Sequence, residues 1–155
     1  AVAELIAARG CACKRRSGKA IRQPATVDVP KVFLGDTMGE LRKFYALASV
    51  VFVGRSLAPM GGSDLMEAAG LAKPILFGPH TDNFMEVAAL LVESGGGRCV
   101  TSAESLARTI IELDRTPDLA ARMSAAARQT IGHAYSFERR MEKMVRVYEE
   151  VLGRA

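Results

Sequence analysis

The sequence of 155 residues has no tryptophan, only two histidines and only three cysteines. Aromatic residues make up 6% of the chain, which argues against a surface that stacks nucleic-acid bases, so we expect no nucleic-acid partner. An odd number of cysteines does not fit a fully paired disulfide framework, and we interpret Cys11, Cys13 and Cys99 as free thiols of a reducing compartment. With so few histidines, we expect neither a metal site nor a cofactor.

Long hydrophobic runs are absent too. No apolar run approaches the roughly 20 residues of a transmembrane helix, and no signal peptide is visible. The chain has no initiator methionine and its first residues already have helical spacing, so we expect an N-terminally truncated fragment. Hydrophobic residues make up 49%, enough for a single domain over 1–155. The net charge of +4 favours anionic partners, although two basic clusters, at 14–22 and 139–146, are more readily explained as solvated faces.

Helical spacing alternates with short apolar runs. We expect buried strands at Lys31–Leu34, Val50–Val53 and Pro74–Phe77, and shorter strands at Cys11–Cys13 and Cys99–Val100. The polar stretch Ser17–Asp28 is predicted to be a mobile loop. Helices are expected at Ala1–Arg9, Gly39–Leu47, Asp64–Leu71, Phe84–Glu93, Ala103–Arg115, Pro117–Gly132 and Phe137–Leu152, with Gly10, Ser102 and Ser136 as caps. Repeated strand–helix units with apolar strands indicate an α/β fold, a Rossmann-like parallel sheet flanked by helices.

Polar, glycine-containing loops follow three of the predicted strands, at 35–39, 54–62 and 78–83. Because ligands bind beyond the carboxyl ends of parallel strands, we expect these loops to cluster on one edge of the sheet. Gly61 and Gly62 permit a positive φ and a close approach of the backbone to a ligand, and the N-terminus of the next helix suits a phosphate. The alternative is that these glycines only make tight turns.

Several polar side chains near these loops have two interpretations. Glu67 is placed to accept hydrogen bonds from ribose hydroxyls, or to sit as a favourable charge near a helix N-terminus. Asp36 and Thr37 suit ligand binding and helix capping equally well, with Glu40 completing the cap. Asn83 is better explained as the N-cap of the helix that follows it. No Ser-His-Asp arrangement, Walker loop or complete dinucleotide fingerprint is present, so the sequence predicts no catalytic residue in this chain.

Three blocks of the sequence resemble one family. They are Val-Phe-Leu-Gly-Asp-Thr-Met-Gly-Glu-Leu at 32–41, Tyr-Ala-Leu-Ala-Ser-Val-Val-Phe-Val-Gly at 45–54, and Lys-Pro-Ile-Leu-Phe-Gly-Pro-His-Thr at 73–81. In order and spacing they resemble the 3-deoxy-D-manno-octulosonic acid (Kdo) transferases of lipopolysaccharide assembly, and the similarity extends over nearly the whole chain.

This resemblance implies the C-terminal, nucleotide-sugar-binding half of a GT-B glycosyltransferase. Kdo transferases move Kdo from CMP-Kdo to a lipid A precursor with inversion, at the cytoplasmic face of the bacterial inner membrane. Their general base, acceptor contacts and membrane anchor belong to the N-terminal half, so we do not expect this chain to be active alone. Carried over by position, the candidate donor contacts are Gly35, Met38, Gly39, Ser56, Gly61, Gly62, Glu67 and Asn83.

The chain departs from the family at one block. Members usually have Gly-Gly-His-Asn-Pro-Leu-Glu-Pro where this chain has Gly-Gly-Ser-Asp-Leu-Met-Glu-Ala at 61–68, and Arg55 replaces a usual glycine. Ser63 and Asp64 keep N-cap chemistry, but Asp64 adds a negative charge that Arg55 would offset, which leaves the donor open. Two alternatives stand: another GT-B transferase or an epimerase of similar fold, and a nucleotide-binding or scaffolding module without catalysis. The helix 137–152 is expected to pack against the N-terminal half, and without it to drive self-association.

Overall fold

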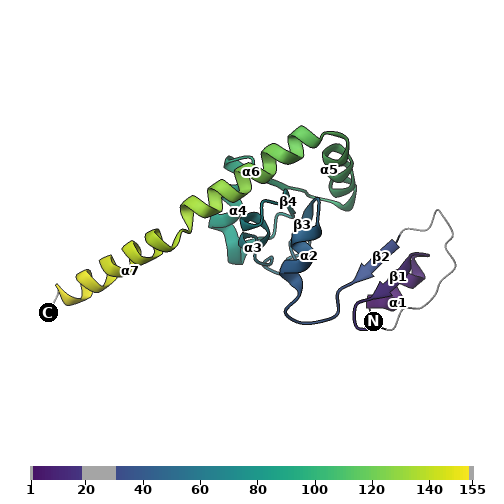
Figure 1. Ribbon diagram of the computed structural model, residues 1–155, viewed down its shortest axis with the longest axis horizontal. Helices are drawn as coiled ribbons and strands as arrows, with labels where there is room; N and C mark the ends of the chain where they lie inside the picture. Colours follow the sequence, from purple (N-terminus) through teal and green to yellow (C-terminus); the bar gives the residue numbers. More distant parts are fainter. Residues whose placement is uncertain (1, 19–30, 154–155) are drawn as a thin grey trace. The chain divides into compact units, whose positions relative to one another are not determined.

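The computed structural model of the protein describes residues 2–18 and 31–153 (Figure 1). The chain divides into two compact units, Ala1–Phe44 and Tyr45–Ala155, and each is described by itself. Each unit contains its own parallel sheet, and the described strands form no hydrogen-bonded ladder other than those within these two sheets. The sequence pattern is therefore right about parallel pairing, whereas the single sheet that it predicts is present as a two-stranded and a three-stranded sheet.

The first unit is built around the helix α1 (Val2–Ala8) and the strands β1 (Ala12–Arg15) and β2 (Lys31–Leu34), which pair in parallel (Figure 1). Gly10 has a φ of 70° and ends α1, as predicted, and the backbone N–H of Cys11 reaches back to the carbonyl of Ile6. The strand predicted at Cys11–Cys13 exists, one residue later and one residue longer than expected. The predicted mobile loop at Ser17–Asp28 lies outside the described residues from position 19 onward.

A sheet with the order β3-β4-β5 forms the centre of the second unit, and its strands are β3 (Val51–Val53), β4 (Ile75–Phe77) and β5 (Gly97–Cys99). Both pairings are parallel, with Val51 opposite Ile75 and Ile75 opposite Gly97. All three residues of β4 are buried, which explains why the strand has a continuous apolar run rather than an alternating one.

Helices cover both faces of this sheet, as the sequence predicts (Figure 1). Ile75 and Phe77 pack into a core with residues of α3 (Met66–Gly70), α4 (Met85–Glu93) and α6 (Pro117–Ala134). On the other face, Leu76 packs with Leu113 of α5 (Ala103–Arg115) and with Met123 of α6. The remaining elements are α2 (Leu41–Leu47), the 3-10 helix η1 (Asp82–Phe84) and α7 (Phe137–Leu152).

Two of the predicted N-caps are confirmed by hydrogen bonds. The hydroxyl of Ser102 accepts from the backbone N–H of Ser105, and the hydroxyl of Ser105 accepts in return from the N–H of Ser102. A serine thus completes a capping box that usually contains a glutamate or glutamine. Ser136 caps α7 by accepting from the N–H of Arg139 at 3.2 Å. Every residue of α7 is exposed, so within the described residues its apolar stripe packs against nothing.

Candidate functional site

The loops that follow β3 and β4 lie together, held by backbone hydrogen bonds. The N–H of Gly62 donates to the carbonyl of Arg55 at 3.1 Å and closes the first loop on itself. The N–H of His80 donates to the carbonyl of Ser56 at 2.9 Å, and the N–H of Asn83 donates to the carbonyl of Gly61 at 3.2 Å. Two of the three predicted loops, 54–62 and 78–83, therefore meet at the carboxyl ends of two adjacent strands.

Ser56 fastens these two loops from inside. Its side chain is completely buried. Its hydroxyl donates a hydrogen bond to the carbonyl of Val53 at 2.5 Å and accepts one from the N–H of Gly78 at 2.8 Å. A Cβ at position 78 would overlap the backbone of Ser56, so only glycine allows the loops to approach this closely. The hydroxyl of Ser56, predicted as a donor contact, is thus engaged within the protein and orders the loops around it.

Gly61, which is half-buried, and Gly62, which is buried, form the turn at the end of the first loop, with φ angles of 78° and 76°. A Cβ on Gly61 would overlap the side-chain amide of Asn83, and one on Gly62 would lie 3.2 Å from the carbonyl oxygen of His80. The tight-turn interpretation therefore accounts for both glycines without a ligand. The same packing places the amide of Asn83 against the turn that the sequence singles out for donor binding.

Asn83 does not cap the helix that follows it, so that prediction is wrong. The 3-10 helix η1 precedes α4, and α4 takes Phe84 as its N-cap residue without a side-chain hydrogen bond. The side chain of Asn83 is exposed and turned instead towards Gly61. Its role as a donor contact stays a prediction.

The helix after the glycine turn is shorter than the sequence predicts. It begins at Met66 rather than at Asp64 and has five residues. The carboxylate of Asp64 accepts a hydrogen bond from the N–H of Met66 at 2.7 Å, so it does satisfy one of the free donors at the helix start. That carboxylate occupies an N–H that a phosphate would otherwise use, and its charge repels a phosphate. The predicted phosphate position is therefore less favourable than the glycine pattern alone implies.

Glu67 lies in the first turn of this helix and is half-buried. Burial raises the pKa of the nearby Tyr45 phenol, and the negative charges of Glu67 and Asp64 raise it further. The phenol of Tyr45 therefore lies within electrostatic range of both carboxylates, which follow the glycine turn in the chain. Such a set of acceptors suits the hydroxyl groups of a sugar, because carboxylates accept hydrogen bonds from neutral donors.

The third predicted loop, 35–39, belongs to the first unit, and the prediction that all three loops share one edge stays a prediction. Its residue Asp36 does not cap α2, in contrast to one of its two interpretations. The carboxylate of Asp36 accepts hydrogen bonds from Ser17 and Arg15, and the hydroxyl of Thr37 donates to the carboxylate of Glu40. The sequence analysis did not identify these partners because it interpreted the basic cluster at 14–22 as a solvated face.

Residues 2–18 and 31–153 contain neither a metal-binding cluster nor a membrane-spanning helix. No group of three or more histidine, cysteine, aspartate or glutamate side chains in these ranges is arranged to hold a metal ion. None of the helices in the same ranges is long and apolar enough to cross a membrane.

Comparison with known proteins gives consistent relatives, although no family model matches the chain. The sequence is 36% identical over 145 residues to the 3-deoxy-D-manno-octulosonic acid transferase of Bordetella pertussis, covering 93% of this chain and 33% of the relative. It is 32% identical over 121 residues to the transferase of the same name from Haemophilus influenzae, covering 77% of this chain and 28% of the relative. The chain thus spans about a third of the length of the curated relatives that it matches.

Among solved structures, the chain is similar to the C-terminal CMP-Kdo binding domain of WaaA from Acinetobacter baumannii. The TM-score is 0.75 and the sequence identity 28%, with 84% of this chain and 66% of that domain covered. Parallel sheets flanked by helices, with glycine-containing loops at the strand ends, define the Rossmann-like C-terminal domain of a GT-B glycosyltransferase. The chain belongs to the 3-deoxy-D-manno-octulosonic acid transferase family.

Proposed function

We propose that this chain is the donor-binding part of an inverting glycosyltransferase that transfers Kdo from CMP-Kdo to a lipid A precursor. The observation that carries the proposal is the likeness, over 84% of the chain, to a domain described as binding CMP-Kdo. The two loops that meet beyond β3 and β4 support it, since ligands of open parallel sheets bind at this edge.

Specific residues would then contact the donor. The turn Gly61-Gly62 would present its backbone to the CMP part, with the amide of Asn83 beside it as a further hydrogen-bond donor. The carboxylate of Glu67 would accept from the ribose hydroxyls. Gly35, Met38 and Gly39 are further candidate contacts of the donor, whereas Ser56 would act through the loops that it joins.

The remaining parts of the reaction would lie outside this chain. A general base in the N-terminal half would activate the acceptor hydroxyl, and the donor-binding half would stabilise the leaving CMP. The full-length protein would then work at the cytoplasmic face of the inner membrane, with the lipid A precursor and the membrane surface as partners. Under this proposal the chain alone binds nucleotide without catalysing transfer.

A second candidate is a GT-B transferase with a different nucleotide sugar. The observation that favours it is the carboxylate of Asp64, which occupies the N–H of Met66 and adds a charge close to the predicted phosphate position. A nucleotide sugar whose negative charges lie elsewhere would be repelled less by this carboxylate than CMP-Kdo. The base of the nucleotide distinguishes the two candidates, because a uridine sugar would be preferred over a cytidine sugar.

The experiment is a titration of the chain with CMP, with UMP as the control, followed through backbone amide chemical shifts. The proposal expects shifts confined to 35–39 and 61–67 that are larger with CMP than with UMP, even at millimolar affinity. Larger shifts with UMP would favour the second candidate. The absence of shifts with either nucleotide, repeated on the full-length protein, would leave the non-catalytic module as the better description.

A further inference from the structure

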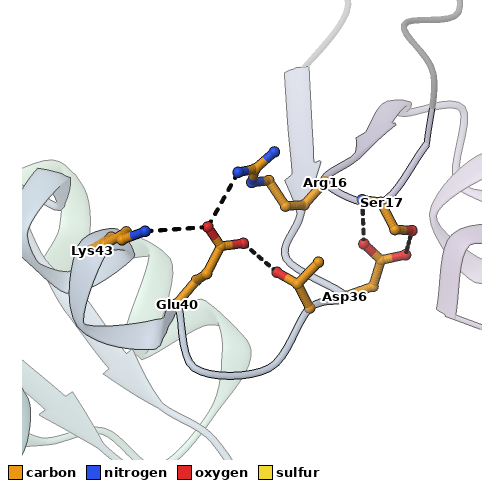
Figure 2. A network of polar contacts seen from close by, with 6 residues as sticks. Arg16, Ser17, Asp36, Glu40 and Lys43 are labelled. Atoms are coloured by element: carbon orange, nitrogen blue, oxygen red, sulfur yellow. Dashed lines mark hydrogen bonds and ion pairs between the residues drawn. The ribbon is translucent and has the colours of Figure 1, made fainter.

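The carboxylate of Asp36 is bound by Arg15, the last residue of β1, and by Ser17, two residues later. Its Oδ1 accepts from the N–H of Ser17 at 2.9 Å, and its Oδ2 accepts from the hydroxyl of Ser17 at 2.5 Å and from Nε of Arg15 at 2.7 Å. Arg15 also forms an ion pair with the same oxygen at 2.6 Å. Figure 2 shows Asp36 facing Ser17, with both of its oxygens used. These bonds to Ser17 and Arg15 hold the pKa of Asp36 well below its usual range.

A second carboxylate, four residues later, is bound in the same way. Oε1 of Glu40 lies 3.1 Å from Nη2 of Arg16 and 3.5 Å from Nζ of Lys43, and its Oε2 accepts from the hydroxyl of Thr37 at 2.5 Å (Figure 2). The hydrogen bond from Thr37, followed by the one from Arg16, lowers the pKa of Glu40. Asp36 and Glu40 thus use three consecutive residues at the end of β1 and just after it, namely Arg15, Arg16 and Ser17.

The segment that contains Asp36 packs against the protein at its first residue, whereas its last two residues before Glu40 face solvent. Gly35 starts the segment against the ring of Phe44, where a Cβ would lie 2.8 Å from a ring carbon. At the tip, Met38 is 96% exposed, and Gly39 has a φ of 77° with open space where a side chain would begin. The side chain of Met38 and the backbone of Gly39 are thus accessible to a ligand.

We propose that Asp36 and Glu40 are positioning residues that fix the segment 36–39 in the shape that receives the nucleotide of the donor. The inference rests on the proposed function, and it adds two residues whose side chains act through the segment that they hold. A segment that is already ordered loses less conformational entropy on binding, and so binds more tightly. Because both carboxylates are paired with arginines, they anchor the segment without leaving an unbalanced negative charge next to an anionic nucleotide.

The test combines two measurements on the same variants of the chain. The variants are Asp36→Ala, Asp36→Asn and Ser17→Ala, with Asp114→Asn on an exposed part of α5 as the control. Backbone 15N relaxation at 36–39 measures order, and the CMP titration measures affinity. We expect the order parameters of the segment to fall from about 0.85 to below about 0.6 in Asp36→Ala. CMP should bind about tenfold more weakly, because the segment must then be ordered on binding.

Further outcomes separate this inference from a simple structural role. Asp36→Asn keeps an acceptor for Ser17 but loses the ion pair with Arg15, so its effect on order and affinity should be intermediate. Ser17→Ala should also lower both the order of the segment and the affinity for CMP. Asp36→Ala and Ser17→Ala should be less than additive, since they remove the same contact. Unchanged order at 36–39 in a folded Asp36→Ala chain overturns the inference, as does a loosened segment with unchanged CMP affinity. A segment that loosens in a chain that never responds to CMP supports the anchoring and contradicts the proposed function.

Discussion

The hydroxyl of Ser56 accepts a hydrogen bond of 2.8 Å from the backbone N–H of Gly78, and both residues are buried. This bond joins the loop after β3 to the loop after β4, and the hydroxyl also donates to the carbonyl of Val53. The sequence does not show that Ser56 and Gly78 are neighbours or where the hydroxyl points, because the two residues follow different strands. The contact makes Ser56 the residue on which the geometry of the two loops depends.

Replacing this residue by Ser56→Ala should destabilise the second unit by about 1–3 kcal/mol, because the buried N–H of Gly78 loses its partner without access to water. Urea unfolding followed by circular dichroism measures the difference. Ser49→Ala provides a matched control, since Ser49 is exposed and the same hydroxyl is removed. Equal stability of the two variants would contradict the role given to Ser56.

Gly61 and Asn83 are predicted to be coupled. Gly61→Ala should destabilise the chain by about 1–2 kcal/mol through the left-handed backbone alone, and further through overlap of its methyl group with the amide of Asn83. Asn83→Ala should relieve the overlap but not the backbone cost. In a double-mutant cycle, Gly61→Ala should therefore cost less in the Asn83→Ala background than in the native chain. The same cost in both backgrounds would show that Asn83 does not pack on the turn in solution.

Arg55 has a φ of 61°, a left-handed backbone conformation that suits glycine. Arg55→Ala keeps the strained Cβ, whereas Arg55→Gly removes it, and both lose the hydrogen bond of 3.1 Å from the guanidinium to the carbonyl of Met60. We expect the glycine variant to be more stable than the alanine variant by about 1 kcal/mol. Ala72 has a φ of 55° and provides an independent test of the cost of a left-handed backbone, because Ala72→Gly removes the Cβ without changing a polar contact. If Arg55→Ala is as stable as Arg55→Gly, the backbone at position 55 is not strained.

Much of the fold is predictable because its signals are local. Continuous apolar runs such as Ile75–Phe77 mark strands buried on both faces, and serines at 102 and 136 mark helix starts. The positions of the loops follow from the parallel pairing alone. What local signals do not show is which strands pair, and for that reason the division into two sheets is missed.

The candidate site is predictable in its residues and less so in their roles. Gly61 and Gly62 are predicted correctly as residues that need a positive φ. The role of Ser56 is missed because its partner lies 22 positions away in the chain. Likewise, helix capping is the common local role of an aspartate before a helix, whereas the partners of Asp36 lie in a segment 19 to 21 positions earlier. Tertiary hydrogen bonds of this kind leave no periodic trace in the sequence.

The carboxylate of Asp36 should titrate unusually low. Its hydrogen bonds to Ser17 and Arg15 favour the ionised form and lower its pKa in the folded chain, so its contribution to stability is present above the unfolded pKa, near 3.8. That contribution is lost as the pH falls below this value towards the folded pKa. The amide chemical shift of Ser17 should therefore stay nearly constant from pH 6 to about pH 3, a range in which an ordinary aspartate titrates. In Asp36→Asn this shift should not titrate, and a midpoint near 4 in the native chain would show that the contact is not formed in solution.

Self-association through α7 is the last prediction. Phe137, Met141, Met144, Tyr148 and Val151 recur at steps of four and three residues along this helix, the spacing of a coiled-coil seam, and all of them are exposed. A second copy of the chain offers the same stripe, so in the absence of another partner we expect the molecular mass in sedimentation velocity to rise with concentration.

Met144→Glu places a charge in the middle of this stripe and should give a monomer at every concentration, because a carboxylate buried between two helices is not solvated. Lys143→Gln is the matched control, since it also lowers the net charge by one but leaves the stripe unchanged. We expect Lys143→Gln to associate as the native chain does. A native chain that sediments as a monomer over the whole range would show that the stripe does not pair with itself, and loss of association in both variants would indicate an electrostatic rather than an apolar contact.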